Sequence, residues 1–142
     1  MKRIVRTSSV KGTMELAASL AAELRPGDVV ALEGDLGAGK TQFVRGLVQG
    51  LGGASRAVSS PTFVLLNIYD TPKMKVYHLD AYRIGGEDDL EAIGFSELLE
   101  QDGLVVIEWW QRVAGLVPQH KWLVQITAIS PRVRNIAISL VG

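Results

Sequence analysis

Residues 34–41 read Gly34-Asp35-Leu36-Gly37-Ala38-Gly39-Lys40-Thr41 and fit the phosphate-binding pattern G-x-x-x-x-G-K-[ST]. The segment 28–33 before them, with an apolar run at 29–32, predicts a short strand, and residues 41–48 after them predict the start of a helix. A strand that leads through a glycine-rich turn into a helix N-terminus directs several backbone N–H groups at one point, which suits a polyphosphate. The sequence therefore predicts a site for a nucleoside triphosphate.

Each residue type in this loop has a physical reason to be there. The glycines at 34, 37 and 39 are expected to permit positive φ and a close approach of the backbone to the ligand. Lys40 is expected to reach the β- and γ-phosphates, and the hydroxyl of Thr41 to hold Mg²⁺. The predicted nucleotide contacts also include Asp35 and Ala38 in the loop and Gln42 just after it.

Composition favours a single folded domain spanning residues 1–142. The chain is 47% apolar, which argues against disorder, and it contains no cysteine, which excludes disulfides and thiolate chemistry. Its 15 basic and 15 acidic residues cancel, so no overall field draws the protein to nucleic acid. No apolar run approaches the roughly 18 residues that span a bilayer, and no signal peptide is recognised, so we expect no membrane association and a cytoplasmic location.

The pattern of elements predicts an α/β fold, a three-layer P-loop NTPase-like sandwich with a mixed central sheet. Residues 2–7 are expected to form an edge strand, and Ser9 to cap a helix that runs to about Leu24. A hairpin is expected from residues 63–69 and 75–80, and one or two short helices around Gly94. Further strands are expected at residues 104–108, 121–129 and 135–141.

Two carboxylates lie where predicted strands end. Hydrolysis or transfer needs a carboxylate near the metal and a group that orients the nucleophile. Glu108 ends the apolar run 104–107, and Asp80 ends the strand 75–80, so both are candidates for the edge of the sheet where ligands bind. The alternatives are that Glu108 caps the following helix at the surface, and that Asp80 belongs to a turn with a local Asp–Arg pair.

A hydroxyl-rich segment, Ser59-Ser60-Pro61-Thr62, lies between the predicted helix and the next strand. Such segments can close on the γ-phosphate as switches, although an ordinary proline-containing turn is equally compatible with the sequence. Of the adjacent Trp109 and Trp110, one is expected in the core and the other against the nucleotide or a partner. His78 is interpreted as a packed histidine rather than a ligand.

Together these segments resemble the TsaE family (also called YjeE), the small bacterial ATPases required for the threonylcarbamoyladenosine modification of tRNA. The resemblance covers nearly the whole chain. It rests on the residues at 34–41 and 59–63, on Tyr77-His78-Leu79-Asp80-Ala81-Tyr82-Arg83, on Gly94-Phe95 and on Glu108-Trp109. It implies a P-loop fold that binds ATP and Mg²⁺, with weak hydrolysis alone. The implied partners are TsaB and TsaD, with tRNA reached only through that complex.

The resemblance also implies roles for individual residues. Lys40 and Thr41 would carry phosphate and metal, and Glu108 and Asp80 would serve the metal or the attacking water. Thr62 would belong to a switch segment whose ordering by ATP alters affinity for TsaB–TsaD. Arg134 falls near a nucleotide-contacting stretch of the family. Gln42 stands where family members often have a second threonine.

Three other functions stay open on sequence alone. A P-loop small-molecule kinase needs an acceptor pocket and usually an arginine-bearing lid, but residues 85–100 contain six acidic residues and no basic one. A GTP-dependent switch commonly uses an Asn/Thr-Lys-x-Asp motif for guanine, which this chain lacks. The third alternative is a nucleotide-binding module without useful hydrolysis, in which Glu108 is structural.

Overall fold

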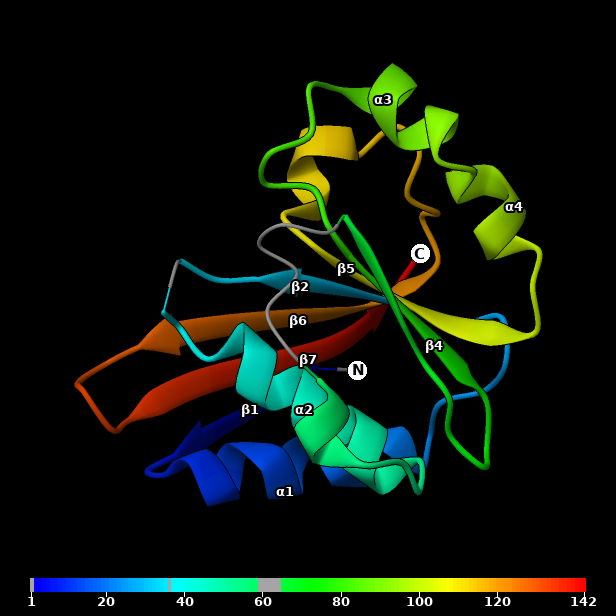
Figure 1. The fold of residues 1–142 in the computed structure, drawn as a ribbon. Coiled ribbons are helices and arrows are strands. Elements are labelled where there is room, and N and C mark those ends of the chain that lie inside the picture. The colour runs from blue at the N-terminus through cyan, green and yellow to red at the C-terminus, as the bar shows by residue number, and fades with distance from the viewer. Residues whose placement is uncertain (1, 36, 59–64) are drawn as a thin grey trace.

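The computed structural model describes residues 2–35, 37–58 and 65–142. A seven-stranded sheet runs through its centre in the order β1-β7-β6-β2-β5-β4-β3 (Figure 1). The strands are β1 (Lys2–Thr7), β2 (Val29–Glu33), β3 (Leu66–Tyr69), β4 (Lys75–Asp80), β5 (Gly103–Glu108), β6 (Lys121–Ala128) and β7 (Arg134–Val141). The helices are α1 (Val10–Ala21), α2 (Lys40–Gly50), α3 (Glu87–Ala92) and α4 (Phe95–Leu99), with 3₁₀ turns η1 (Ser55–Ala57) and η2 (Trp110–Val113).

The sheet is mixed, with parallel strands at its centre and antiparallel strands at its edges. β4, β5, β2 and β6 run parallel to one another. β3 pairs antiparallel with β4 on one side, while β7 and then β1 extend the sheet in antiparallel fashion beyond β6. The parallel strands therefore bring their carboxyl ends to the same edge of the sheet, which is where ligands bind in open α/β folds.

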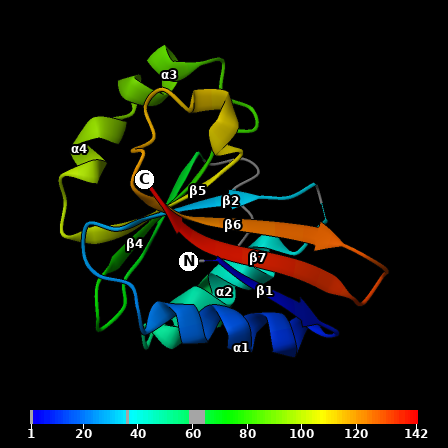
Figure 2. The same cartoon turned by 180° about the vertical axis from the view of Figure 1, so that it is seen from behind.

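Helices cover both faces of this sheet, which makes three layers (Figures 1 and 2). α1 and α2 pack on one face, and the cluster under them includes Leu32 and Val106. α3, α4 and η2 pack on the other face, over a cluster that includes Ala31 and Ile107. Neighbouring residues of β2 and of β5 thus alternate between two cores, as period-2 strands require. The predicted three-layer α/β sandwich with a mixed sheet is confirmed.

Most predicted elements match the structure, with differences at their ends. Ser9 caps α1 as expected, because its hydroxyl accepts the Gly12 N–H at 2.9 Å. The helix ends at Ala21 rather than near Leu24, since the Leu24 N–H bonds three residues back and Pro26 cannot continue a helix. The hairpin is confirmed, although residues 63 and 64 of its predicted first strand lie outside the described part of the chain. Across that described part, no helix has the length and apolar character to cross a membrane.

Glycines let the backbones of α1 and α2 approach closely. A Cβ added at Gly46 would collide with the Met14 carbonyl oxygen and lie 2.7 Å from the Ala17 Cβ. One turn later, a Cβ added at Gly50 would lie 2.7 Å from the Ala18 Cα. These separations are shorter than any packed carbon contact, so only glycine allows the present spacing between the two helices.

We therefore expect Gly46→Ala to destabilise the fold, although alanine is about 1 kcal/mol better than glycine in a helix interior. The added methyl must push α1 and α2 apart, and overpacking of this kind costs about 1–3 kcal/mol. Urea denaturation measures the change in the free energy of unfolding. The exposed Gln49→Ala in the same helix is the control and should leave stability nearly unchanged. A Gly46→Ala variant as stable as the native protein would contradict the close contact.

Candidate functional site

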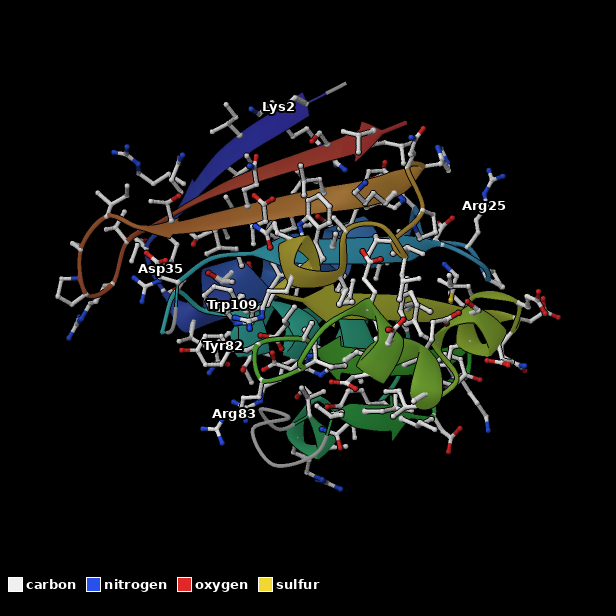
Figure 3. All side chains as sticks on the ribbon, turned by 90° about the horizontal axis from the view of Figure 1, so that it is seen from above. Lys2, Arg25, Asp35, Tyr82, Arg83 and Trp109 are labelled. Carbon is white, nitrogen blue, oxygen red and sulfur yellow. The ribbon has the colours of Figure 1, made fainter. Side chains whose placement is uncertain are left out.

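The candidate site lies at the edge of the sheet where β2, β5 and β4 end. Glu108 at the end of β5 pairs in register with Leu32 of β2 on one side and with Asp80 of β4 on the other. The glycine-rich loop, residues 34–41, leaves β2 at this edge and enters α2 at Lys40. Figure 3 shows Asp35 of this loop beside Trp109, which directly follows Glu108. The strand order thus gathers the loop and both predicted carboxylates in one place.

The glycines of the loop have two different functions. Gly37 and Gly39 have φ of 80° and 109°, in the left-handed region that favours glycine. Gly34 does not have positive φ, contrary to the expectation from its sequence. A Cβ there would instead lie 2.9 Å from the Ile126 carbonyl oxygen of β6, so Gly34 is required by close packing between the loop and the sheet. The reason for this glycine lies in a strand almost a hundred residues away and is not visible in the motif.

Lys40 is buried at the start of α2, with a relative exposure of 6%. Its ammonium donates to the Gly34 carbonyl oxygen at 2.7 Å and lies 3.9 Å from Glu108 Oε1. It also lies 4.0 Å from the centre of the Trp109 ring. Burial lowers the pKa of Lys40 below its usual value, and the negative charges nearby, with Glu108 the strongest, oppose that shift. The lysine is therefore a desolvated cation that an anion can stabilise.

Glu108 is buried as well and joins Lys40 to a histidine. Its exposure is 5%, and Oε2 lies 2.6 Å from Nε2 of the fully buried His78. Nδ1 of His78 lies 3.1 Å from the Tyr69 hydroxyl. His78 is packed, as its sequence suggested, but sequence reasoning missed its contact with the candidate carboxylate. The sequence did contain a signal that His78 faces the site: His78 and the candidate Asp80 are two residues apart on one strand, so their side chains share a face of the sheet.

Asp80 lies at the same edge but is more accessible than Glu108. Its Oδ1 accepts the Tyr82 N–H at 2.8 Å, so the side chain also supports the turn that follows β4. Burial raises the pKa of Asp80, and the neighbouring Glu108 acts in the same direction, while the bond from Tyr82 and the charge of Lys40 oppose the shift. The turn interpretation and the site interpretation of Asp80 are thus compatible.

Trp109 has a backbone conformation that places its ring over the loop lysine. Its φ is 58°, the one positive value among the described residues that are not glycine. A left-handed residue with a side chain costs roughly 1–2 kcal/mol, so the surrounding contacts must hold it. The centre of this ring lies 4.9 Å from that of the Tyr82 ring (Figure 3). On Tyr82, the guanidinium of Arg112 lies 5.9 Å from the ring centre. The strained turn therefore places the Trp109 ring, packed against that of Tyr82, beside Lys40.

Trp110 points to a different part of the edge. Its indole Nε1 donates to Glu33 at 3.1 Å, and Lys121 lies 4.7 Å from its ring centre. Glu33 also accepts from the Gln125 amide at 2.8 Å, which ties the end of β2 to β6. Trp109 and Trp110 are both partly buried, so the expectation that one of the two lies in the core was wrong.

Arg134, at the first position of β7, binds the main chain of the glycine-rich loop. Its Nε donates to the Ala38 carbonyl oxygen at 2.7 Å, and its Nη2 lies 3.4 Å from that of Gly37. The same guanidinium donates to the Ser130 carbonyl oxygen at 2.8 Å. The structure thus brings Arg134 to the predicted loop, where its observed contacts are with main-chain oxygens.

A cavity of about 340 Å³ opens beside the start of α2. Gln42, in the first turn of the helix, lines it, and the partly buried Thr41 precedes Gln42. The other walls come from the start of α1, from the glycine-rich loop and from the turn between β6 and β7 with the first residue of β7: Ser8, Ser9, Val10, Thr13, Gly39, Pro131, Arg132 and Arg134. The cavity is continuous with the glycine-rich loop through Gly39. Thr62 and the rest of the predicted switch segment 59–62 lie outside the described residues.

The donor set at this edge fits a magnesium ion better than a transition metal. It offers the carboxylates of Asp80 and Glu108 and the hydroxyl of Thr41, and Mg²⁺ prefers oxygen ligands. Within the described ranges, no group of three or more His, Cys, Asp or Glu residues is arranged to hold a metal. In proteins Mg²⁺ is usually bound by one or two carboxylates together with phosphate oxygens and water.

The fold and this edge define an α/β protein with a glycine-rich loop between a central parallel strand and a helix, facing two carboxylates. Residues 7–136 match the family model of TsaE, described as a threonylcarbamoyl adenosine biosynthesis protein. The chain belongs to the TsaE family, whose members are part of tRNA threonylcarbamoyladenosine biosynthesis.

Individual relatives agree with this assignment. The chain is 38% identical over 137 residues to the tRNA threonylcarbamoyladenosine biosynthesis protein TsaE of Bacillus subtilis, covering 96% of this chain and 85% of the relative. It is 43% identical over 110 residues to TsaE of Rickettsia prowazekii, covering 78% and 76%. The crystal structure of YdiB from Bacillus subtilis superposes with a TM-score of 0.82 at 30% identity, covering 100% of this chain and 87% of that one.

Removing the charge of Asp80 should stabilise the protein in the absence of magnesium and nucleotide. Because its folded-state pKa is raised, Asp80 stabilises the fold at low pH, and that contribution is lost as the pH rises through the folded-state pKa. Asp80→Asn stays neutral and can still accept the Tyr82 N–H. We expect a higher free energy of unfolding than native at pH 7.5, with the difference shrinking toward the ordinary carboxyl pKa of 3.8.

Urea denaturation in the presence of EDTA, repeated across this pH range, measures the effect. Asp102→Asn, which removes the same charge from an exposed position, is the matched control and should show a flat difference. Loss of stability in Asp80→Asn at pH 7.5 would show that the carboxylate contributes to the fold as an ion.

Proposed function

We propose that this protein binds ATP with Mg²⁺ and hydrolyses it weakly, as a component of the threonylcarbamoyladenosine machinery that acts through TsaB and TsaD. One observation carries the proposal: Lys40 and Glu108 are buried together, 3.9 Å apart, where the glycine-rich loop enters α2. An ammonium ion and a carboxylate hidden at a helix N-terminus are costly to keep unless they serve a charged ligand.

Three features of the loop support a polyphosphate as that ligand. Lys40, Thr41 and Gln42 form the first turn of α2, whose N–H groups have no partners within the helix. The positive end of the helix dipole adds to these donors. Burial makes the ammonium of Lys40 poorly solvated, so a phosphate oxygen would gain more from it than from an exposed lysine.

The carboxylates would supply the second part of the site. In this proposal Thr41, Asp80 and Glu108 hold Mg²⁺, directly or through water, and the ion supplies positive charge for the phosphate oxygens. Glu108 Oε1 faces Lys40 and the loop, where it can also orient a water molecule for attack. Asp80 is the more accessible of the two carboxylates, so a hydrated Mg²⁺ would reach it more easily.

The cavity beside Gly39 and Gln42 suits the nucleoside. It begins at the first turn of α2 and extends to Arg132 and Val10, so phosphates held by the loop would leave the base and ribose inside it. On the α1 side it is lined by the small side chains of Ser8, Ser9, Val10 and Thr13, which would leave room for a flat ring. A preference for adenine over guanine follows from the family resemblance and from the absence of an Asn/Thr-Lys-x-Asp motif in the sequence.

Action through partner proteins agrees with the charge of the chain. Fifteen basic and fifteen acidic residues leave no net attraction to RNA, yet the relatives are named for a tRNA modification. A neutral ATPase in such a pathway would affect the tRNA through a protein interface. We therefore propose TsaB and TsaD as the partners, with tRNA held by their complex, and a cytoplasmic location stays a prediction.

A small-molecule kinase is less well supported by the surroundings of the site. Between Gly85 and Glu100, α3 and α4 expose acidic side chains, and no basic residue occurs in this stretch. A kinase for an anionic acceptor needs cations that approach the transferred phosphate. Phosphate transfer to a metabolite at rates above hydrolysis would favour the kinase.

Lys40→Ala should lose most of the affinity for ATP. The ammonium is the buried cation of the loop, and charge-assisted bonds of this type are worth about 1.5–3 kcal/mol each, which is roughly a 10- to 100-fold loss of affinity. Isothermal calorimetry with ATP and Mg²⁺ measures the change. Lys75→Ala, at an exposed lysine on β4, is the control and should bind as the native protein does. Unchanged affinity in folded Lys40→Ala would refute the phosphate site.

Glu108→Gln should keep ATP binding and lower hydrolysis by at least tenfold, because the amide can neither hold the metal as well nor accept a proton. The assay measures phosphate release by the full chain, alone and with TsaB, TsaD and tRNA. Strong stimulation of the native protein is expected when the other components are present. Native hydrolysis in Glu108→Gln with all components present would show that this carboxylate is structural.

A further inference from the structure

A buried hydrogen-bonded row crosses three strands and ends at the candidate catalytic carboxylate. Tyr69 on β3 contacts His78 on β4, and His78 contacts Glu108 on β5, at 3.1 and 2.6 Å. All three side chains are on the face of the sheet that α1 and α2 cover, since they alternate with residues of the opposite core. His78 is fully buried and has no part in the function proposed above.

We propose that His78 is a positioning residue for Glu108: it holds Oε2 so that Oε1 faces Lys40 and the glycine-rich loop. This inference rests on the proposed role of Glu108 in hydrolysis and adds a further residue to that site. The two oxygens of the carboxylate have different partners, His78 for Oε2 and the ammonium of Lys40 for Oε1. The orientation of the carboxylate is therefore determined from both sides.

The two contacts differ in strength. The distance from His78 Nε2 to Oε2, 2.6 Å, is that of a strong charge-assisted hydrogen bond. The 3.9 Å between Lys40 Nζ and Oε1 is an ion pair without a hydrogen bond. Fixing the carboxylate thus depends mainly on the histidine. A phosphate that draws Lys40 away would leave the bond to His78 intact, because it involves the other oxygen.

The Tyr69 hydroxyl is the second hydrogen-bond partner of the His78 ring. An ionised carboxylate only accepts hydrogen bonds, so His78 Nε2 carries the proton in this pair. In the neutral ring Nδ1 then has a lone pair and accepts from the Tyr69 hydroxyl. The contact with Tyr69 is compatible with the tautomer that donates to Glu108, and it helps to hold the ring in place. A group that orients a ligand or base in this way commonly changes activity by about 10- to 100-fold when it is lost.

A residue that only filled space at position 78 would not need to be polar. The positions around His78 on this face are aliphatic, with Val76 two residues earlier and Val106 opposite on β5. An aliphatic side chain would complete that layer without a buried polar ring that must be satisfied. The polar ring is placed where its Nε2 lies 2.6 Å from Oε2 of the buried Glu108.

Two amide substitutions of His78 separate the alternatives. His78→Gln places an amide N–H near the position of Nε2, within reach of Glu108, whereas His78→Asn places it near Nδ1, toward Tyr69. The full chain is assayed with TsaB, TsaD and tRNA, and ATP affinity is measured by calorimetry. We expect His78→Asn to lower kcat by about 10- to 100-fold, with ATP affinity within about twofold of native, and His78→Gln to recover most of that loss.

A double-mutant cycle tests whether His78 acts through Glu108. In the Glu108→Gln background, His78→Asn should lower kcat by less than about twofold, because the group it positions is already lost. Val106→Ala, a cavity beside His78 that leaves Glu108 untouched, should lower stability and leave kcat near native. A loss as large in the Glu108→Gln background as in the native one would overturn the proposal. So would equal kcat for the Gln and Asn variants.

These outcomes remain distinguishable from failure of the proposed function. If Glu108→Gln hydrolyses ATP normally, the proposed role of Glu108 fails first, whatever His78 does. If Glu108→Gln is impaired and His78→Asn is not, only the positioning role is wrong. A crystal structure of His78→Asn without ligands gives a readout independent of activity. It should show the Glu108 carboxylate rotated away from Lys40, and an unchanged carboxylate would overturn the proposal.

Discussion

Lys40 and Glu108 form a buried ion pair at the end of the central strands, and the arrangement of this edge depends on it. With exposures of 6% and 5%, neither charge can rely on water, so each needs partners from the protein. Because β2 pairs in parallel with β5, the loop that follows β2 and the carboxylate that ends β5 lie at the same edge of the sheet. Trp109, in its strained conformation, lies against Lys40, and His78 is hydrogen-bonded to Glu108.

The sequence predicted the parts of this site that depend on local pattern. The motif at residues 34–41 located the loop, and the apolar run before Glu108 predicted a buried strand that ends in a carboxylate. Since parallel strands end at one edge, the joint position of Glu108 and the loop followed from the fold class alone. The hairpin at Asp70 and the break at Gly94 were visible as turn chemistry.

Contacts between distant segments could not be predicted in this way. The carbonyl oxygen of Ile126 explains Gly34, and Arg134 reaches across to Ala38, yet no short-range signal links these residues. The distance between Lys40 and the Trp109 ring depends on a positive φ that propensity does not favour for tryptophan. Tertiary contacts select such conformations, so they emerge only when the whole sheet is assembled.

Main-chain contact between α1 and α2 fixes the width of the cavity that both helix starts line. Gly46 lies one turn beyond Gln42, and Met14 directly follows Thr13, so the point of contact is close to both walls. Side chains can rotate to make room, whereas two touching backbones cannot move apart without shifting a whole helix. The width of the cavity between the two helix starts is therefore set by the backbones, so a ligand bound there would have to match that width.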